Sequence, residues 1–263
     1  MTTLLLIDIQ NDFHPGGSLA IPNADKDAER TANFIKKHSA SISRIALTLD
    51  SHQRLHIAHP VFWNNSSGEH PNPFTIISME DVKSGKWIPR SDIKQKRSDV
   101  KQPPNCSRSG PLIDIDVFAK HGPIPDKLYD SNGDLNMVEY CIEYTRRLEA
   151  KGKFQLCIWP EHCLIGSYGH NVVPKIMDAI NYWSHETGAS PEWINKGQNL
   201  VTEKYSALCA EVPVSEKTDY DNVLFEWVRY IIVICSILDI RLYGIILINF
   251  LSHTSYDQYI KHS

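Results

Sequence analysis

The sequence predicts an α/β fold in which helices flank a mostly parallel β-sheet. Residues 4–9 and 42–49 are almost uninterrupted apolar runs, typical of strands buried on both faces. Between them, residues 25–38 have apolar side chains at helical spacing and acidic side chains in the first turn. A helix between two buried strands is the usual way to join parallel neighbours, so this order predicts a parallel sheet.

The elements expected further along the chain continue this alternation. They are a helix over 135–151, a strand over 154–159, a helix over 171–186 and a strand over 193–195. For the first helix, Asp134 is the expected N-cap and Gly152 the expected end. We expect strands 3–9, 43–49 and 154–159 to be neighbours, with the helices packed on the faces of the sheet.

Composition excludes several classes of protein. The 263 residues carry 27 basic and 31 acidic side chains, a net charge of 27 − 31 = −4, so nucleic acid is not an expected partner. The six cysteines form no CxxC pair, and the amino terminus has no basic leader. We therefore expect a reduced, cytoplasmic protein.

Two regions carry a weak fold signal. Residues 51–134 contain many prolines and glycines and no long periodic stretch, which indicates a long insertion over about 64–134. Residues 228–251 are strongly apolar but are interrupted by Arg229, Asp239 and Arg241. Because charges within a membrane span are costly, membrane binding is not expected, and a buried strand or an atypical tail is preferred.

Reactive side chains follow the predicted strands at their carboxyl ends. Asp8, Asp50, His52, His162 and Lys196 all occupy such positions. In open parallel sheets this edge is where ligands bind, so the grouping predicts a functional site there.

A metal site is expected around Asp50 and His52. The two side chains lie two residues apart, and so on the same face of an extended segment. Carboxylate and neutral imidazole together suit Zn²⁺, Mn²⁺ or Fe²⁺. From the residues alone, the third ligand is His56, His59 or His162.

Four segments together resemble the nicotinamidase/isochorismatase-like cysteine hydrolases and follow that family's order. The segments are IDIQNDF followed by PGGSL in residues 7–19, Asp50-x-His52-x-x-x-His56, Trp159-Pro160-x-His162-Cys163, and Lys196-Gly197. They cover residues 1 to about 215 and are nearest to the nicotinamidase branch. The resemblance implies a three-layer sandwich around a central, mostly parallel sheet.

The resemblance also implies roles for these residues. Asp8 would be the general base, with Lys196 beside it. Asp50, His52 and His162 would hold a divalent metal, with Zn²⁺ expected and Mn or Fe as alternatives. Phe13 and Trp159 would wall the substrate pocket, and His56 would lie near the metal and contact substrate. The implied reaction cleaves nicotinamide to nicotinate and ammonia through a thioester on a cysteine.

The nucleophilic cysteine is where the chain departs from the family. The family's segment of the form G-x-A-x-x-x-C-V is not present after residue 225, and Cys235 is the one cysteine there. We therefore expect a hydrolase domain over 1–225 and an atypical apolar tail over 226–263, with Cys235 as the candidate nucleophile. The alternative is an inactive relative that keeps the metal and ligand pocket as a binding or regulatory protein. The expected partner is a small-molecule substrate, and a homo-oligomer is left open.

Overall fold

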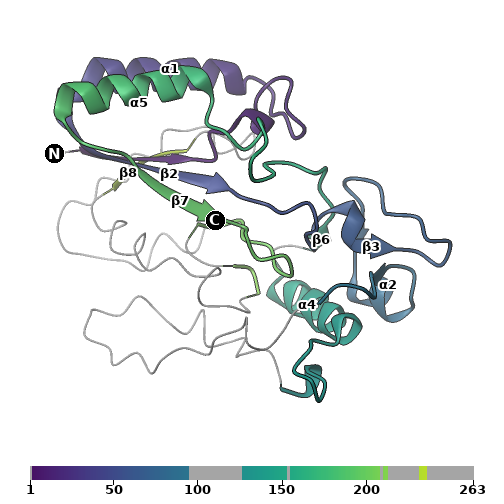
Figure 1. The fold of residues 1–263 in the computed structure, drawn as a ribbon. Coiled ribbons are helices and arrows are strands. Elements are labelled where there is room, and N and C mark those ends of the chain that lie inside the picture. The colour runs from purple at the N-terminus through teal and green to yellow at the C-terminus, as the bar shows by residue number, and fades with distance from the viewer. Residues whose placement is uncertain (1, 95–125, 153–154, 208–209, 213–230, 236–263) are drawn as a thin grey trace, which may run out of the picture.

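A four-stranded parallel sheet organises the chain (Figure 1). The computed structural model describes residues 2–94, 126–152, 155–207, 210–212 and 231–235. The strands are β1 (Thr2–Ile7), β2 (Ile42–Asp50), β7 (Glu192–Lys196) and β8 (Ile231–Cys235), in the spatial order β7-β2-β1-β8. All three pairings are parallel, as the buried apolar runs predict.

Two helices lie side by side on one face of this sheet, α1 (Ala24–His38) and α5 (Pro174–Thr187) (Figure 1). Their apolar stripes meet the sheet in one core, with Ile35 and Trp183 fully buried against Leu47. Each buried aliphatic side chain of this size contributes roughly 1.5–3 kcal/mol to folding. We call the four strands with α1 and α5 the sheet unit.

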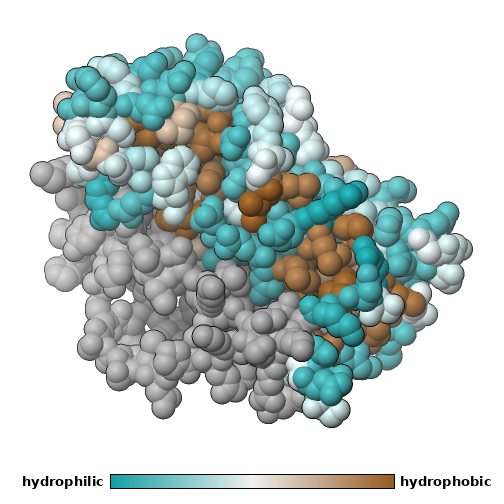
Figure 2. Space-filling model, viewed as in Figure 1, coloured by the Kyte–Doolittle hydropathy of each residue, from teal (hydrophilic) through white to brown (hydrophobic). Residues whose placement is uncertain are grey.

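A second core forms around α4 (Met137–Lys151). It includes α2 (Met79–Lys83) and two short antiparallel pairs, β3 (Trp63–Asn64) with β5 (Ile88–Pro89) and β4 (Ile76–Ile77) with β6 (Leu156–Cys157). Four short 3₁₀ segments are also described: Asn11–Phe13, Ser39–Ser41, Pro60–Phe62 and Asp126–Leu128. We call residues 55–94, 126–152 and 155–159 the α4 unit. Figure 2 shows the apolar side chains gathered in separate brown areas over the two units.

The prediction that residues 154–159 join the parallel sheet is wrong. Only Leu156–Cys157 form a strand, β6, and it pairs antiparallel with β4. The backbone beyond it bonds to loops instead, since Ile158 N–H donates to Thr75 O (2.8 Å) and Trp159 N–H to Ala58 O (2.7 Å). A short apolar run shows that a segment is buried, but it does not specify which strand the segment pairs with.

Helix boundaries follow the predictions with two corrections. The cap of α4 is Asn136, whose side chain accepts from Glu139 N–H (3.3 Å), and not Asp134. Helix α5 begins at Pro174, three residues after the predicted start, because proline is favoured in the first turn. Gly152 ends α4 with φ +66°, as expected of a glycine after a helix.

Parts of the predicted insertion and tail lie outside the described residues, namely 95–125, 226–230 and 236–263. Within the predicted tail, residues 231–235 form β8 and pair with β1. Among the helices that the structure describes, none is long and apolar enough to cross a membrane.

Candidate active site

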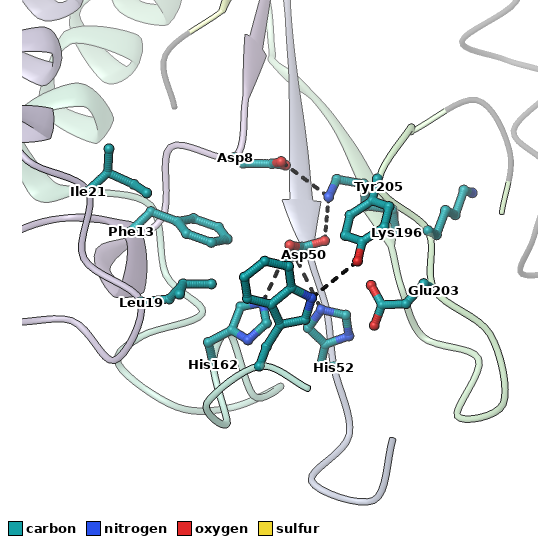
Figure 3. Close-up of a pocket in the computed structure, with 12 residues that line it drawn as sticks. Asp8, Phe13, Leu19, Ile21, Asp50, His52, His162, Lys196, Glu203 and Tyr205 are labelled. Carbon is teal, nitrogen blue, oxygen red and sulfur yellow. Dashed lines mark hydrogen bonds and ion pairs between the residues drawn. The ribbon is translucent and has the colours of Figure 1, made fainter. Parts of the chain in front are cut away.

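The charged residues predicted at the strand ends meet at one edge of the sheet (Figure 3). Asp8 follows β1, while Asp50 and Lys196 end β2 and β7. Asp50 and Lys196 are direct partners in the parallel register of β2 and β7. The ladder of backbone pairing therefore brings the ammonium to the two carboxylates.

Lys196 bridges Asp8 and Asp50. Its Nζ lies 3.2 Å from Asp8 Oδ2 and donates a short hydrogen bond to Asp50 Oδ1. Thr48 Oγ1 donates to the other oxygen of Asp8 (2.9 Å). The Lys196 side chain is only 2% exposed, so these contacts are what make burial of its charge tolerable.

Burial and mutual attraction set the protonation of this group. Burial raises the pKa of Asp8 to about 6, against the opposing effect of the Lys196 ammonium. Burial alone would lower the pKa of Lys196, but the two carboxylates raise it above its usual value. Burial would likewise raise the pKa of Asp50, but Lys196 holds it well below the usual range. Near neutral pH all three groups are thus charged, and Asp8 is the one poised to gain a proton.

Asp8 adopts a left-handed backbone conformation, with φ +53°. Few residues other than glycine tolerate this region, and aspartate is among those that do. The Asp8 N–H still donates to Thr48 O (3.1 Å), so the residue stays tied to the neighbouring strand while the chain turns out of the sheet. Backbone strain of this kind is often found at functional sites.

Asp50, His52 and His162 converge beside this group, with ligand atoms all within 4.8 Å of one another. Nε2 of each histidine lies 3.8 Å from Asp50 Oδ2. That is too long for a hydrogen bond, whereas two ligands each about 2.1 Å from one ion lie about 3–4 Å apart. The spacing therefore fits a bound divalent ion.

Backbone carbonyls orient both histidines for this role. His52 Nδ1 lies 3.0 Å from Gly197 O, and His162 Nδ1 lies 2.8 Å from Pro160 O. Each Nδ1 is therefore the protonated nitrogen, and each Nε2 keeps a free lone pair that faces Asp50. Metal-binding histidines in proteins are held in this way. Burial lowers the pKa of His52 to about 3, so this ring is neutral, as a ligand must be.

Two polar side chains outside the cavity lining, those of Gln10 and Asp12, hydrogen-bond to the backbone at or next to the candidate ligands. The Gln10 amide donates to Asp50 O (2.7 Å) and accepts from Asp50 N–H (2.7 Å), which fixes the end of β2. Asp12 Oδ2 accepts from Cys163 N–H (2.6 Å), next to His162. The sequence motif contained both residues but indicated neither contact.

A cavity of about 100 Å³ opens over these groups. Phe13, Leu19 and Ile21 line one side, while Trp159 and Tyr205 line another, and Trp159 Nε1–H donates to Tyr205 Oη (3.3 Å). Phe13 also packs edge-on against His162, with ring centroids 5.7 Å apart. The cavity is therefore small and aromatic, with the charged groups in its lining (Figure 3).

Glu203, Lys204 and Tyr205 also line the cavity and were not predicted. Burial, then the charge of Asp50, raises the pKa of Glu203 to about 8, so its carboxyl is largely neutral at pH 7. These residues lie in an irregular segment, where periodicity gives no signal. Their position shortly after Lys196-Gly197 at a strand end was the one available indication.

His56 is fully buried near the metal ligands but does not line the cavity. Its ring centroid is 4.6 Å from that of His52, and its Nδ1 lies 3.4 Å from Glu203 Oε1. The structure therefore places His56 beside the candidate ligand His52 but outside the cavity lining, where it was expected to contact substrate.

The described cysteine side chains, at positions 141, 157 and 163, make no hydrogen bond to Asp8 or Lys196. Cys163 is buried against Phe13 and Ala24, and burial raises the pKa of its thiol. Cys235 is the last residue of β8, and its partner in the register is Ile7, the residue before Asp8. The topology therefore places Cys235 at the same sheet edge as Asp8, although its side chain lies outside the described part of the chain.

Among solved structures, the chain is similar to nicotinamidases. No family model and no curated protein matches the sequence. The yeast nicotinamidase bound to the inhibitor nicotinaldehyde is 16% identical over 89% of this chain and 74% of its own, with a TM-score of 0.48. An Acinetobacter baumanii nicotinamidase/pyrazinamidase is 17% identical over 89% and 69%, with a TM-score of 0.44.

A zinc complex of the Pyrococcus horikoshii pyrazinamidase is 16% identical over 78% of this chain and 57% of its own, with a TM-score of 0.34. At such identities and TM-scores, the likeness assigns no activity to the chain. The fold itself is an α/β fold with a parallel sheet and flanking helices, and in that respect it is similar to these nicotinamidase and pyrazinamidase structures.

Proposed function

We propose that the protein is a metal-dependent cysteine hydrolase of a small aromatic amide, with nicotinamide as the substrate. The observation that carries the proposal is the juxtaposition of two groups in one cavity. Asp8, a buried carboxylate that could act as a base, forms an ion pair with Lys196. This pair lies beside Asp50, His52 and His162, whose spacing fits a divalent ion. The names of the similar solved structures, nicotinamidases and pyrazinamidases, suggest the same substrate class.

The walls of the cavity suit a flat ring. Phe13 and Trp159 offer aromatic surfaces to a heteroaromatic amide, and aromatic contacts of this kind contribute about 0.5–1.5 kcal/mol each beyond burial. A divalent ion held by Asp50, His52 and His162, which we propose to be Zn²⁺ with Mn or Fe as alternatives, would supply a Lewis-acidic anchor for a substrate nitrogen.

In the proposed reaction, Asp8 accepts the proton of the Cys235 thiol, and the sulfur attacks the amide carbonyl. The C–N bond breaks, the amine takes up a proton and leaves as ammonia, and water then hydrolyses the thioester to release the acid and the thiol. Thiolate is the competent nucleophile, so a base with a pKa of about 6 within the same site suits this step. Lys196 would stabilise the negative charge that develops.

A second candidate is a binding protein without turnover. It is favoured by one observation, that no described cysteine side chain bonds to Asp8 or Lys196. In this case the cavity and the metal ligands would bind an aromatic amide or acid and leave it unchanged.

One assay separates the two candidates. The purified full chain, zinc-loaded or stripped with chelator, is incubated with nicotinamide, and ammonia and nicotinate are quantified. The enzyme proposal expects turnover that is lost on chelation, in Cys235→Ala and in Asp8→Asn. Calorimetric binding of nicotinamide with no product from any sample would support the binding protein instead.

A further inference from the structure

His59 is a buried histidine that the sequence offered as a candidate ligand and that the group of Asp50, His52 and His162 does not include. Its side chain is fully buried, and its Nδ1 lies 3.1 Å from Arg54 O. That contact makes Nδ1 the protonated nitrogen, which leaves a lone pair on Nε2. Nε2 has no hydrogen-bond partner among the described residues. A buried polar atom left unsatisfied costs about 1–3 kcal/mol, so a partner of some kind is expected at Nε2.

The neighbours of His59 are the two histidine ligands. Its ring centroid lies 5.4 Å from that of His52 and 5.6 Å from that of His162, while those two rings are 4.8 Å apart. An ion bound at about 2.1 Å lies about 3.2 Å from a ring centroid, so two rings on one ion at angles of 90–120° have centroids about 4.5–5.5 Å apart. All three distances fall in or next to that range.

His59 also shares the tautomer of the two candidate histidine ligands. In His52, His162 and His59 alike, Nδ1 contacts a backbone carbonyl oxygen, so Nε2 is the free nitrogen. His56, the fourth ring of this cluster, differs, because its Nδ1 accepts from Ala58 N–H (3.3 Å) and its Nε2 must therefore carry the proton. The Nε2 atoms of both rings are buried and have no hydrogen-bond partner among the described residues, but only that of His59 has the lone pair that a ligand needs.

The local backbone holds His59 in place. Its N–H donates to His56 O (2.8 Å), and its own carbonyl accepts from Phe62 N–H (3.2 Å) at the start of the 3₁₀ turn Pro60–Phe62. His52 and His162 line the cavity, whereas His59 does not. His59 thus contacts the ligand cluster from outside the cavity lining.

We infer that His59 is a fourth protein ligand of the metal, which it binds through Nε2 from the side opposite the cavity. The inference rests on the metal site of the proposed function. His59 lies outside the group whose ligand atoms are all within 4.8 Å of one another, so its ring moves toward the ion on binding. With Asp50, His52 and His162, it gives a three-nitrogen, one-oxygen set that leaves the cavity side open to substrate.

The test is metal binding by His59→Ala in the full chain, with His70→Ala as the matched control. His70 has the same Nδ1 contact with a backbone carbonyl, 2.6 Å from Trp63 O, but is exposed and outside the cavity lining. Zinc affinity is measured by competition with a chromophoric chelator, and the ligand field by the visible spectrum of the Co²⁺-loaded protein. His59→Gln repeats the test if the alanine variant does not fold by circular dichroism.

For His59→Ala we expect zinc affinity to fall at least tenfold and the Co²⁺ bands to change in position and intensity. His70→Ala should match wild type in both. Wild-type affinity and an unchanged Co²⁺ spectrum in His59→Ala would overturn the inference, and would mean that Nε2 is satisfied by water. Failure of the wild-type chain to bind zinc at all would instead overturn the metal site of the proposed function, and this inference with it.

Discussion

The sheet unit and the α4 unit contribute to the site in different ways. In the sheet unit, Asp8, Asp50 and Lys196 are placed by long parallel ladders, in which each backbone pair supports the next. His59 and Trp159 lie on irregular segments of the α4 unit, and His52 and His162 lie on irregular segments beside it. One hydrogen bond from Nδ1–H to a backbone carbonyl orients each ring, with Gly197 O as the acceptor for His52 and Arg54 O for His59. The charged group is therefore positioned collectively, whereas the candidate histidine ligands are positioned one at a time.

The largest loss of unfolding free energy should come from removing the Lys196 ammonium at the sheet edge. Lys196→Met leaves Asp8 and Asp50 buried without a counter-ion, and breaking a buried pair in this way costs about 3–5 kcal/mol of unfolding free energy. Urea denaturation measures the loss. As the contrast from the α4 unit, Arg146→Met removes one exposed ion pair with Glu143, which keeps its second partner Arg147, and should cost about 1 kcal/mol or less. Equal losses of unfolding free energy in the two variants would contradict the difference between the sheet unit and the α4 unit.

A matched pair of glycines tests how locally one metal ligand is held. A Cβ at Gly197 would lie 2.6 Å from His52 Cε1, whereas a Cβ at Gly188 would meet nothing within 4 Å. Both have positive φ, at +78° and +69°, so both alanine variants carry the same backbone strain of about 1 kcal/mol. Only Gly197→Ala should also displace His52 and weaken zinc binding tenfold or more, as measured by chelator competition. Equal zinc affinities in the two variants would show that the His52 ring is not held where Gly197 places it.

The pH dependence of turnover should report the state of Asp8. Its pKa is raised to about 6, so the base is lost as pH falls through 6, and kcat/KM should drop about fivefold between pH 6 and pH 5. Protonation of Asp8 does not itself unfold the protein over this range. A carboxyl whose pKa is higher in the folded state than in the unfolded chain takes up its proton in the folded state first, so its contribution to stability rises as pH falls from 6 toward 4. Initial rates of nicotinamide hydrolysis between pH 5 and pH 8, with circular dichroism at each pH, check both statements. A flat profile over this range would exclude Asp8 as the base.

The smallest expected change in stability comes from removing the N-cap of α4, within the α4 unit. Asn136→Ala removes the side chain that accepts from Glu139 N–H, and the loss of an N-cap costs about 1 kcal/mol. Asp134→Ala, at the position that the sequence indicated as the cap, should cost less. Neither variant should change zinc affinity, because α4 carries no metal ligand. Thermal unfolding of the two variants measures the difference, and a greater loss in Asp134→Ala would restore the original assignment of the cap.

The sequence predicted most of the regular strands and helices, and it missed features that depend on individual contacts between residues. Strands 4–9, 42–49 and 193–195 and helix 25–38 were identified because burial and periodicity leave a strong pattern. The pairing of β2 with β7, which places Asp50 beside Lys196, was not among the predicted neighbours, because the sequence pattern identifies strands but not their partners. The partner of residues 154–159 could not be predicted, because both a parallel sheet and the antiparallel β4–β6 pair bury the same side chains.

The same limit applies within the site. His56, His59 and His162 were equal candidates for the third ligand, since spacing alone does not show which nitrogen of a ring is free. That property depends on the backbone atom that the other nitrogen contacts, here Ala58 N–H for His56 and Arg54 O for His59. Glu203 and Tyr205 were missed for a similar reason, as an irregular segment gives no periodic signal.

The pairing of β1 with β8 has a consequence for the timing of synthesis. Thr3 pairs with Ile231, which lies 228 residues further along the chain, so β1 cannot be flanked on both sides until the ribosome has passed residue 235. At about 5–20 residues per second, one edge of an apolar strand waits on the order of ten to fifty seconds for its partner. Unpaired strand edges recruit other chains, so the nascent protein should depend on chaperones during that interval. Slower translation should therefore lower the yield of soluble protein.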